Sequence, residues 1–302
     1  MSACARRGDR IRPGRTARLT RSRALALVAL AQLAIGAAAI FARYALDGGG
    51  GPLAIGAARL TIAAIPLLVI AGVRGALRVD RRTAVRLGVA GLALAAHFGC
   101  WITSLAHASV AISTLLVCTT PIFTEIYAVA RRRAIDGWTA ASIFGALAGV
   151  AIVVGAPDRA NAPLGIALAL AGAVAIGVYL VLVRDVDARF GTLTVTARTY
   201  TIAAVALAFG ALIAREHLPP VHDAAAWGGI LAMALISQMF GHTALNAAVR
   251  VLTATFVSTV TLLEPVVAAV LAAWLFGERL GAATGIGALI ILGAIAVAVR
   301  AA

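Results

Sequence analysis

Ten long apolar segments, separated by short polar or Gly- and Pro-bearing breaks, make up nearly the whole sequence. A helix needs about 20 apolar residues to cross the hydrocarbon core of a bilayer. Because 62% of the residues are hydrophobic and only 13% are charged, the composition excludes an ordinary soluble domain. The sequence predicts an all-α integral membrane protein with ten transmembrane helices. The expected spans are residues 24–46, 53–73, 84–106, 108–129, 137–155, 162–183, 192–214, 224–246, 251–275 and 281–299.

The placement of positive charge predicts how these spans are oriented. All 26 basic residues are arginines, and eight of them lie in residues 1–23, a basic tail before the first span. If that tail is cytoplasmic, roughly twenty arginines fall on the cytoplasmic side and about four outside, which is the bias that orients membrane proteins. The net charge of +14 is then explained by topology, so no nucleic-acid partner is expected. We expect a multi-pass protein of the inner membrane with both termini cytoplasmic.

The two halves of the chain repeat one another. The segment that starts at Ser109 aligns with the segment that starts at Thr253, and Pro121 then falls on Pro265. Earlier in each half, Arg59 falls on Arg198. The sequence thus predicts two five-helix repeats, residues 24–156 and 162–299. Since five is odd, the second repeat enters the membrane from the opposite side, and such inverted repeats place a substrate site at their interface near the bilayer midplane.

Several of these segments resemble a known family. The stretch LLEPVVAAVLAAWLFGERLGAATGIGALIILGA, and more weakly its copy in the first half, resembles the closing segment of EamA-type members of the drug/metabolite transporter (DMT) superfamily. The resemblance implies ten helices in inverted repeats, cytoplasmic termini and carrier activity, often the export of amino acids or related metabolites. The first half departs from the family pattern, because Ala134 stands where the second half has Glu278 of a GER turn.

Two polar stripes are candidates for the lining of a central cavity. Polar and aromatic side chains share one face of the third span and one face of the eighth, because they recur every three or four residues. They are His97, Trp101 and Ser104 in the third span and Gln238, His242 and Asn246 in the eighth. Imidazole, amide and indole groups would suit a zwitterionic or polar small molecule, with Trp101 as a stacking surface. The alternative is that these side chains only bond helices together.

One charge and two prolines interrupt the fourth and ninth spans. Pro121 and Pro265 repeat, so they belong to the shared architecture, and each is expected to free a backbone carbonyl and to act as a hinge or a fixed bend. Glu264 is aligned with Thr120, so its carboxylate belongs to one half only. An intramembrane carboxylate marks a functional site by default, although a packing role is the alternative. Glu264, like His97 or His242, could bind solute or carry a coupling proton.

Secondary candidates are polar residues with a weaker pattern. Arg59 and Arg198 could bind a carboxylate bidentately, but their repetition favours a shared structural role such as tying a helix end to neighbouring carbonyls. The others are isolated polar points, namely Gln32 in the first span and Tyr179 in the sixth.

Other classes of protein lack support in the sequence. We find no metal-ligand spacing, no nucleophile with its base and no Gly-rich phosphate loop, so neither an enzyme nor an ATP-driven pump is indicated and no cofactor or metal is expected. The expected partners are a small-molecule substrate and the lipid bilayer. We expect a secondary transporter that moves a small polar organic solute, an amino acid or related metabolite, outward across the inner membrane by alternating access. An exporter of cationic or amphipathic drugs is the alternative, with Glu264 attracting the cation. The sequence does not indicate an oligomeric state.

Overall fold

The computed structural model describes residues 19–108, 110–131, 134–154, 163–276 and 282–301, so the expected basic tail lies mostly outside the described residues. Those ranges contain no strand, and the predicted all-helical fold is confirmed. The helices are α1 (Arg21–Gly36), α2 (Ala38–Asp47), α3 (Pro52–Val73), α4 (Arg81–His107), α5 (Val110–Val117), α6 (Thr120–Ala130), α7 (Gly137–Val154), α8 (Pro163–Phe190), α9 (Thr192–Ala214), α10 (Ala224–Ala232), η1 (Met233–His242), α11 (Thr243–Val249), α12 (Ala254–Val260), η2 (Thr261–Leu263), α13 (Glu264–Phe276) and α14 (Ala282–Ala301).

Among the described residues, six stretches are long and apolar enough to cross a membrane. They are α1 with α2, α3, α4, α8, α9, and the continuous stretch of α10, η1 and α11. These coincide with the first, second, third, sixth, seventh and eighth expected spans. The other four expected spans fall on α5 with α6, α7, α12 with α13, and α14, which are not among the six. Ten spans therefore stay a prediction, and several membrane-capable helices are observed.

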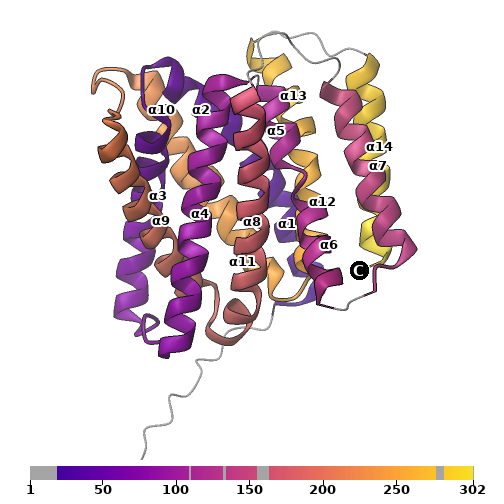
Figure 1. The fold of residues 1–302 in the computed structure, drawn as a ribbon, viewed down its shortest axis with the longest axis horizontal. Helices are drawn as coiled ribbons and strands as arrows, with labels where there is room; N and C mark the ends of the chain where they lie inside the picture. Colours follow the sequence, from indigo (N-terminus) through magenta and orange to yellow (C-terminus); the bar gives the residue numbers. More distant parts are fainter. Residues whose placement is uncertain (1–18, 109, 132–133, 155–162, 277–281, 302) are drawn as a thin grey trace, which may run out of the picture.

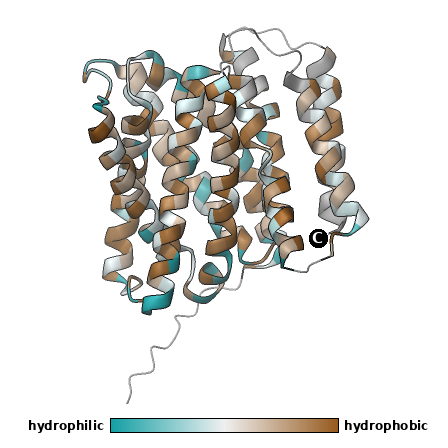
Figure 2. Cartoon of the chain, viewed as in Figure 1, coloured by the Kyte–Doolittle hydropathy of each residue, from teal (hydrophilic) through white to brown (hydrophobic). Residues whose placement is uncertain are grey.

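The helices lie side by side in one bundle (Figure 1), in which helices from the two halves of the chain pack against each other. α3 packs along α9, α4 along α8 and α9, and α7 along α14. α3 and α9 carry the repeated arginines, so elements at matching positions in the expected repeats are partners in space. The colouring by hydropathy shows apolar residues along the helices and hydrophilic ones concentrated at their ends (Figure 2).

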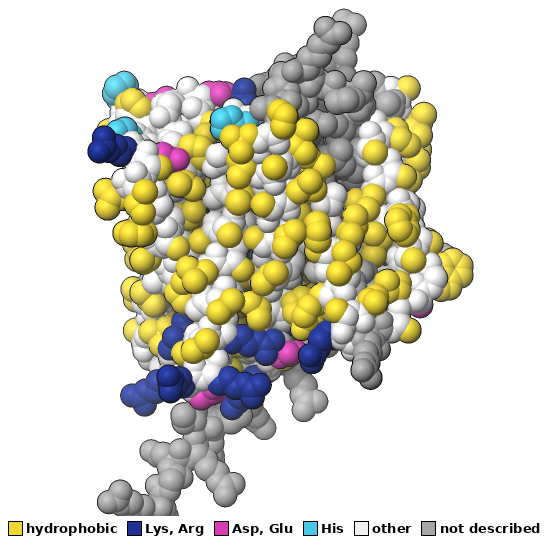
Figure 3. Space-filling model, in the orientation of Figure 1, with side chains coloured by type: hydrophobic (Ala, Val, Ile, Leu, Met, Phe, Trp, Pro, Cys, Tyr) yellow, Lys and Arg dark blue, Asp and Glu magenta, His cyan; other side chains and the backbone are white. Residues whose placement is uncertain are grey.

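Arginine side chains gather at the lower end of the bundle in the orientation of Figure 3, below a broad apolar band. At that end Arg86 of α4 holds the C-terminal part of α8: its Nε donates to the carbonyl of Leu182 over 2.7 Å, and its Nη2 lies 3.1 Å from a carboxylate oxygen of Asp185. Arg189 at the end of α8 lies 3.6 Å from Asp80. These contacts fasten α4 to α8 at the arginine-rich end.

Local capping fixes where two of the long helices begin. Asp80 precedes α4, and its carboxylate accepts hydrogen bonds from the backbone N–H and the hydroxyl of Thr83, each over 2.9 Å. These bonds lower the pKa of Asp80 below its usual value. At the opposite end of the bundle Glu216, far along the chain, caps α3 by accepting from the N–H groups of Leu53 (2.6 Å) and Ala54 (3.0 Å). A carboxylate at a helix N-terminus is favoured by the helix dipole.

Helix interruptions occur beside both repeated prolines. The fourth expected span breaks at Cys118 and Thr119, so Pro121 lies in the first turn of α6. The ninth expected span is interrupted by the short 3₁₀ helix η2. Pro265 follows as the second residue of α13. In each case the proline directly follows the interruption, in the first turn of a new helical segment. The N–H that a proline lacks would have no intrahelical acceptor there, so its absence costs little. The prolines therefore start new helical segments and do not kink continuous helices.

Candidate functional site

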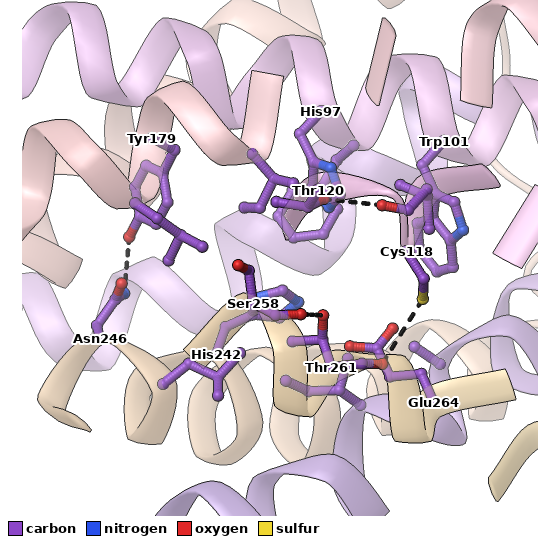
Figure 4. Close-up of a pocket in the computed structure, with 17 residues that line it drawn as sticks. His97, Trp101, Cys118, Thr120, Tyr179, His242, Asn246, Ser258, Thr261 and Glu264 are labelled. Atoms are coloured by element: carbon purple, nitrogen blue, oxygen red, sulfur yellow. Dashed lines mark hydrogen bonds between the residues drawn. The ribbon is translucent and has the colours of Figure 1, made fainter. Parts of the chain in front are cut away.

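A cavity lies between helices from both halves of the chain, beside the middle of α8 and the C-terminal half of α4. Its other walls come from α1 and α2, the break between α5 and α6, η1 with α11, and the segments α12, η2 and α13. Figure 4 shows the lining side chains. Polar and aromatic groups contribute much of the lining, together with aliphatic side chains such as Ile35. They are His97, Phe98, Trp101, Cys118, Thr120, Tyr179, His242, Asn246, Ser258, Thr261 and Glu264.

The cavity is narrow in this conformation. The centres of water-sized molecules can occupy about 50 Å³ of it, several times the ~10–15 Å³ that one water needs. That space holds a few waters, whereas pockets for organic ligands typically measure ~300–1,000 Å³. A bound organic molecule would therefore require the helices around the cavity to move apart.

Four rings in contact with one another line the cavity, three from α4 and one, His242, from η1 (Figure 4). The rings of His97 and Trp101 are stacked with their centroids 6.4 Å apart, and the Phe98 ring meets His242 edge to face at 5.2 Å. His97 is oriented by its Nδ1, which donates to the carbonyl oxygen of Gly172 in α8 over 3.0 Å. In a neutral imidazole this bond leaves Nε2 as an acceptor. The indole Nε1 of Trp101 has no partner among the described residues, so it can donate to a bound molecule.

Hydrogen-bonding side chains also line the cavity. The amide Nδ2 of Asn246 donates to the hydroxyl of Tyr179 over 2.7 Å, which joins α11 to α8 beside the cavity (Figure 4). The Glu264 carboxylate lines the cavity and makes no hydrogen bond or ion pair with the described residues. An acid without a partner at a cavity surface is available to an ammonium or another donor of a solute.

Comparison with known proteins identifies the family of this chain. The model of a family described as EamA-like transporters matches residues 22–155 and again residues 163–300. The chain belongs to the EamA-like transporter family. The resemblance to EamA-type members of the DMT superfamily is thereby confirmed, and the protein is a multi-pass membrane transporter with a two-repeat layout. No curated protein matches the sequence.

A solved structure supports the same fold. A crystal structure described only as that of a protein shares 21% sequence identity with this EamA-like chain, at a TM-score of 0.77. The similarity covers 94% of this chain and 99% of the other. At that identity the likeness concerns the fold alone.

The structure brings together six of the residues singled out from the sequence. His97, Trp101, His242, Asn246, Glu264 and the secondary candidate Tyr179 all line the cavity. Among the described residues, no group of three or more His, Cys, Asp and Glu side chains could hold a metal ion. In this member of the EamA-like family the cavity offers rings, one amide, hydroxyls, a thiol and one carboxylate.

Gln238 does not line the cavity, although the pattern predicted it on the same face as His242. It is fully buried, and its Oε1 accepts from Nη2 of Arg59 over 2.8 Å. Gln238 and His242 both lie in the π-helical stretch η1. The Gln238 amide is held by Arg59 of α3, so it faces a neighbouring helix instead of the cavity.

Ser104 also lies outside the cavity. Its hydroxyl is fully buried, bonds the carbonyl of Trp101 over 2.7 Å and lies 2.5 Å from the hydroxyl of Ser113 in α5. A serine hydroxyl often returns to a carbonyl of its own helix, which turns it away from a lumen. Ser104 thus joins α4 to α5, the interhelical role left open from the sequence.

The remaining secondary candidates lie elsewhere in the bundle. Arg198 donates through Nη2 to the carbonyl of Leu77, beyond the end of α3, which is the tie expected for the repeated arginines. Arg59, its counterpart in the first half, donates to the side chain of Gln238 instead of a backbone carbonyl. Gln32 is fully buried in α1, and its amide makes no hydrogen bond with the described residues.

Four cavity residues beside the helix breaks were not identified from the sequence. They are Cys118, Thr120, Ser258 and Thr261. The available signal was the repeated proline, because three of the four lie within four residues of Pro121 or Pro265. Hydroxyls and thiols are common in transmembrane helices, where they bond nearby carbonyls, so their residue type alone does not indicate a cavity.

Proposed function

We propose that this EamA-family transporter is a secondary carrier that moves a small polar organic solute, an amino acid or related metabolite, outward across the inner membrane. The observation that carries the proposal is the cavity beside the middle of α8, where both halves of the chain contribute polar side chains. A site at the repeat interface near the bilayer midplane is the arrangement that alternating access requires.

The proposed carrier has ten spans in two inverted repeats of five. Segments α5 with α6, α7, α12 with α13, and α14 supply the four spans beyond the six stretches described above. The gathering of arginines at one end of the bundle supports the orientation in which that end is cytoplasmic (Figure 3). Both termini then lie on the cytoplasmic side.

Alternating access follows from the narrow cavity. A solute larger than a few waters enters only when helices part on one side, and it leaves when they part on the other. The breaks next to Pro121 and Pro265 give the fourth and ninth spans short segments that can tilt separately. At the arginine-rich end, the contacts of Arg86 with α8 must open for exchange with that side. His97, His242 and Glu264 bind the solute in this scheme. The alternative mechanism to be tested is that one of them carries a coupling proton.

A second candidate function is export of cationic or amphipathic drugs. The specific observation in its favour is that the Glu264 carboxylate and the Trp101 indole line one cavity, because a cation can pair with an acid and stack on an indole. The two candidates differ in solute charge, so one assay separates them.

The test is solute exchange by the purified protein in liposomes. We expect labelled L-amino acids to exchange across the membrane, above the rate of protein-free liposomes. A broad amino-acid panel that gives no flux, while cationic dyes are carried, would establish the drug-export alternative. Imposing a proton gradient in the same liposomes tests coupling, since a proton-coupled carrier would accumulate solute against its gradient.

A further inference from the structure

The guanidinium of Arg59 is buried without an opposite charge. The side chain is 0% exposed, and no described residue forms an ion pair with it. Of its five N–H donors, one on Nη2 bonds an oxygen, Oε1 of Gln238 at 2.8 Å. Nη1 faces the sulfur of Met233 at 4.0 Å, and Nε has no partner. The charge is thus far from satisfied.

Such an arrangement is unusual because a buried charge is strongly penalised unless it is paired and hydrogen-bonded. Two aromatic rings compensate in part, since the Arg59 guanidinium carbon lies 4.2 Å from the centroid of the Phe98 ring and 5.9 Å from that of Trp101. The counterpart in the second half behaves differently, because Arg198 bonds a backbone carbonyl and is only partly buried. The repeated architecture therefore does not account for the environment of Arg59.

The two rings against Arg59 are also walls of the cavity. Phe98 and Trp101 both line it, and the Phe98 ring packs edge to face against His242. Gln238, the hydrogen-bonding partner of Arg59, belongs to the same π-helical stretch as His242. Arg59 is therefore next to the cavity, in contact with the ring that forms part of its wall. A rotation of the Phe98 side chain during opening would expose the guanidinium to a bound solute.

We propose that Arg59 is the anion-binding group of this transporter and that its solute carries a carboxylate, which pairs with the guanidinium when the cavity opens. The inference rests on the carrier function proposed above and names the chemical class of its solute. A guanidinium presents its N–H donors in a fork that matches the two oxygens of a carboxylate.

Charge balance favours a carboxylate over a phosphate and over a cation. The cavity beside Arg59 is lined by Glu264, whose carboxylate would repel a dianionic phosphate and attract an ammonium. A cationic drug would in turn be repelled by the unpaired Arg59. A solute with one carboxylate and one amino group complements both.

Competition in liposomes tests the proposal with the unmodified protein. Exchange of labelled L-amino acids is measured against three series of competitors: the L-amino acids, their α-amides and their decarboxylated amines. We expect the acids to compete on the order of tenfold to a hundredfold more strongly than the matched amides and amines. Aminophosphonic acid analogues should compete less well than the acids. Equal competition by acids, amides and amines would overturn the carboxylate assignment while leaving carrier activity intact. Absence of flux with every compound would reject the carrier function itself.

Variants assign the effect to Arg59. Arg59→Gln should reduce the ratio of acid to amide competition to about one, and Arg59→Lys, which keeps a charge but loses the fork, should give an intermediate ratio. Arg198→Gln is the matched control, because it removes the repeated arginine that bonds Leu77, and it should keep the wild-type ratio. If Arg59→Gln folds and still prefers acids as strongly as the wild type, another group binds the carboxylate.

Discussion

The thiol of Cys118 donates a hydrogen bond to the carbonyl oxygen of Thr261 over 3.6 Å, which joins the interruptions of the fourth and ninth expected spans. The matching carbonyl in the first half, that of Val117, accepts from the hydroxyl of Thr120 over 2.8 Å. The prolines were expected to leave these two carbonyls without a hydrogen bond. Neither carbonyl is free, because a nearby thiol and a nearby hydroxyl donate to them. A thiol is a weak donor, so the contact between the two broken helices can open at little cost.

Replacing Pro121 with alanine tests whether the break is needed for movement. We expect the free energy of unfolding to change by less than about 1 kcal/mol, because Pro121 lies in the first turn of α6 and gives up no intrahelical bond. Transport should slow, since alanine lets α5 and α6 merge into one helix. Pro66→Ala is the control, because Pro66 lies inside α3 and away from the cavity. Equal transport by both variants would remove the hinge role.

Substitutions of His97 separate its structural bond from its binding role. His97→Ala removes the side-chain hydrogen bond to the Gly172 carbonyl, which lies inside α8, and should lower stability by about 0.5–1.5 kcal/mol in thermal unfolding. His97→Asn should recover most of that loss, because an amide nitrogen can replace Nδ1. Both variants lose the cavity-facing part of the imidazole, so both should transport poorly. Wild-type flux by His97→Asn would show that the ring serves packing only.

Glu264 is expected to recognise a positive group of the solute. Glu264→Gln, and Glu264→Thr, which copies the residue at the matching position in the first half, should raise the KM for amino acids on the order of tenfold or more. N-acetylated amino acids, which lack the ammonium, should compete equally with wild type and variant. An unchanged KM in both variants would assign the carboxylate to helix packing.

Arg86 is expected to hold the arginine-rich end closed. Its guanidinium bonds the carbonyls of Val181 and Leu182 and pairs with Asp185. Arg86→Ala should lower the free energy of unfolding by about 1–3 kcal/mol. It should also make cysteines introduced along α8 at that end more reactive. The control is Arg82→Ala, one turn earlier and exposed. If the two variants show the same cysteine reactivity, the Arg86 contacts do not control opening.

Hydropathy and self-similarity predicted the helical fold, because each helix depends mainly on its own composition in a bilayer. Side-chain directions were less predictable. His242 and Asn246 reach the cavity, whereas Gln238 does not, because its amide bonds Arg59 of α3, and the sequence does not show which neighbour a buried amide will meet. Arg59 and Arg198 match in sequence yet have different partners, since a partner depends on the neighbouring helix rather than on the repeat.

The most direct test of the cavity as the solute site uses Cys118 in a protein that also carries Cys4→Ser and Cys100→Ser. Cys118 lines the cavity, whereas Cys100 does not. A transported amino acid should slow modification of Cys118 by methyl methanethiosulfonate, with half-protection near its KM. It should leave modification of Cys100 unchanged in a protein that retains only that cysteine. Modification of Cys118 at the same rate with and without saturating solute would contradict the assignment of this cavity.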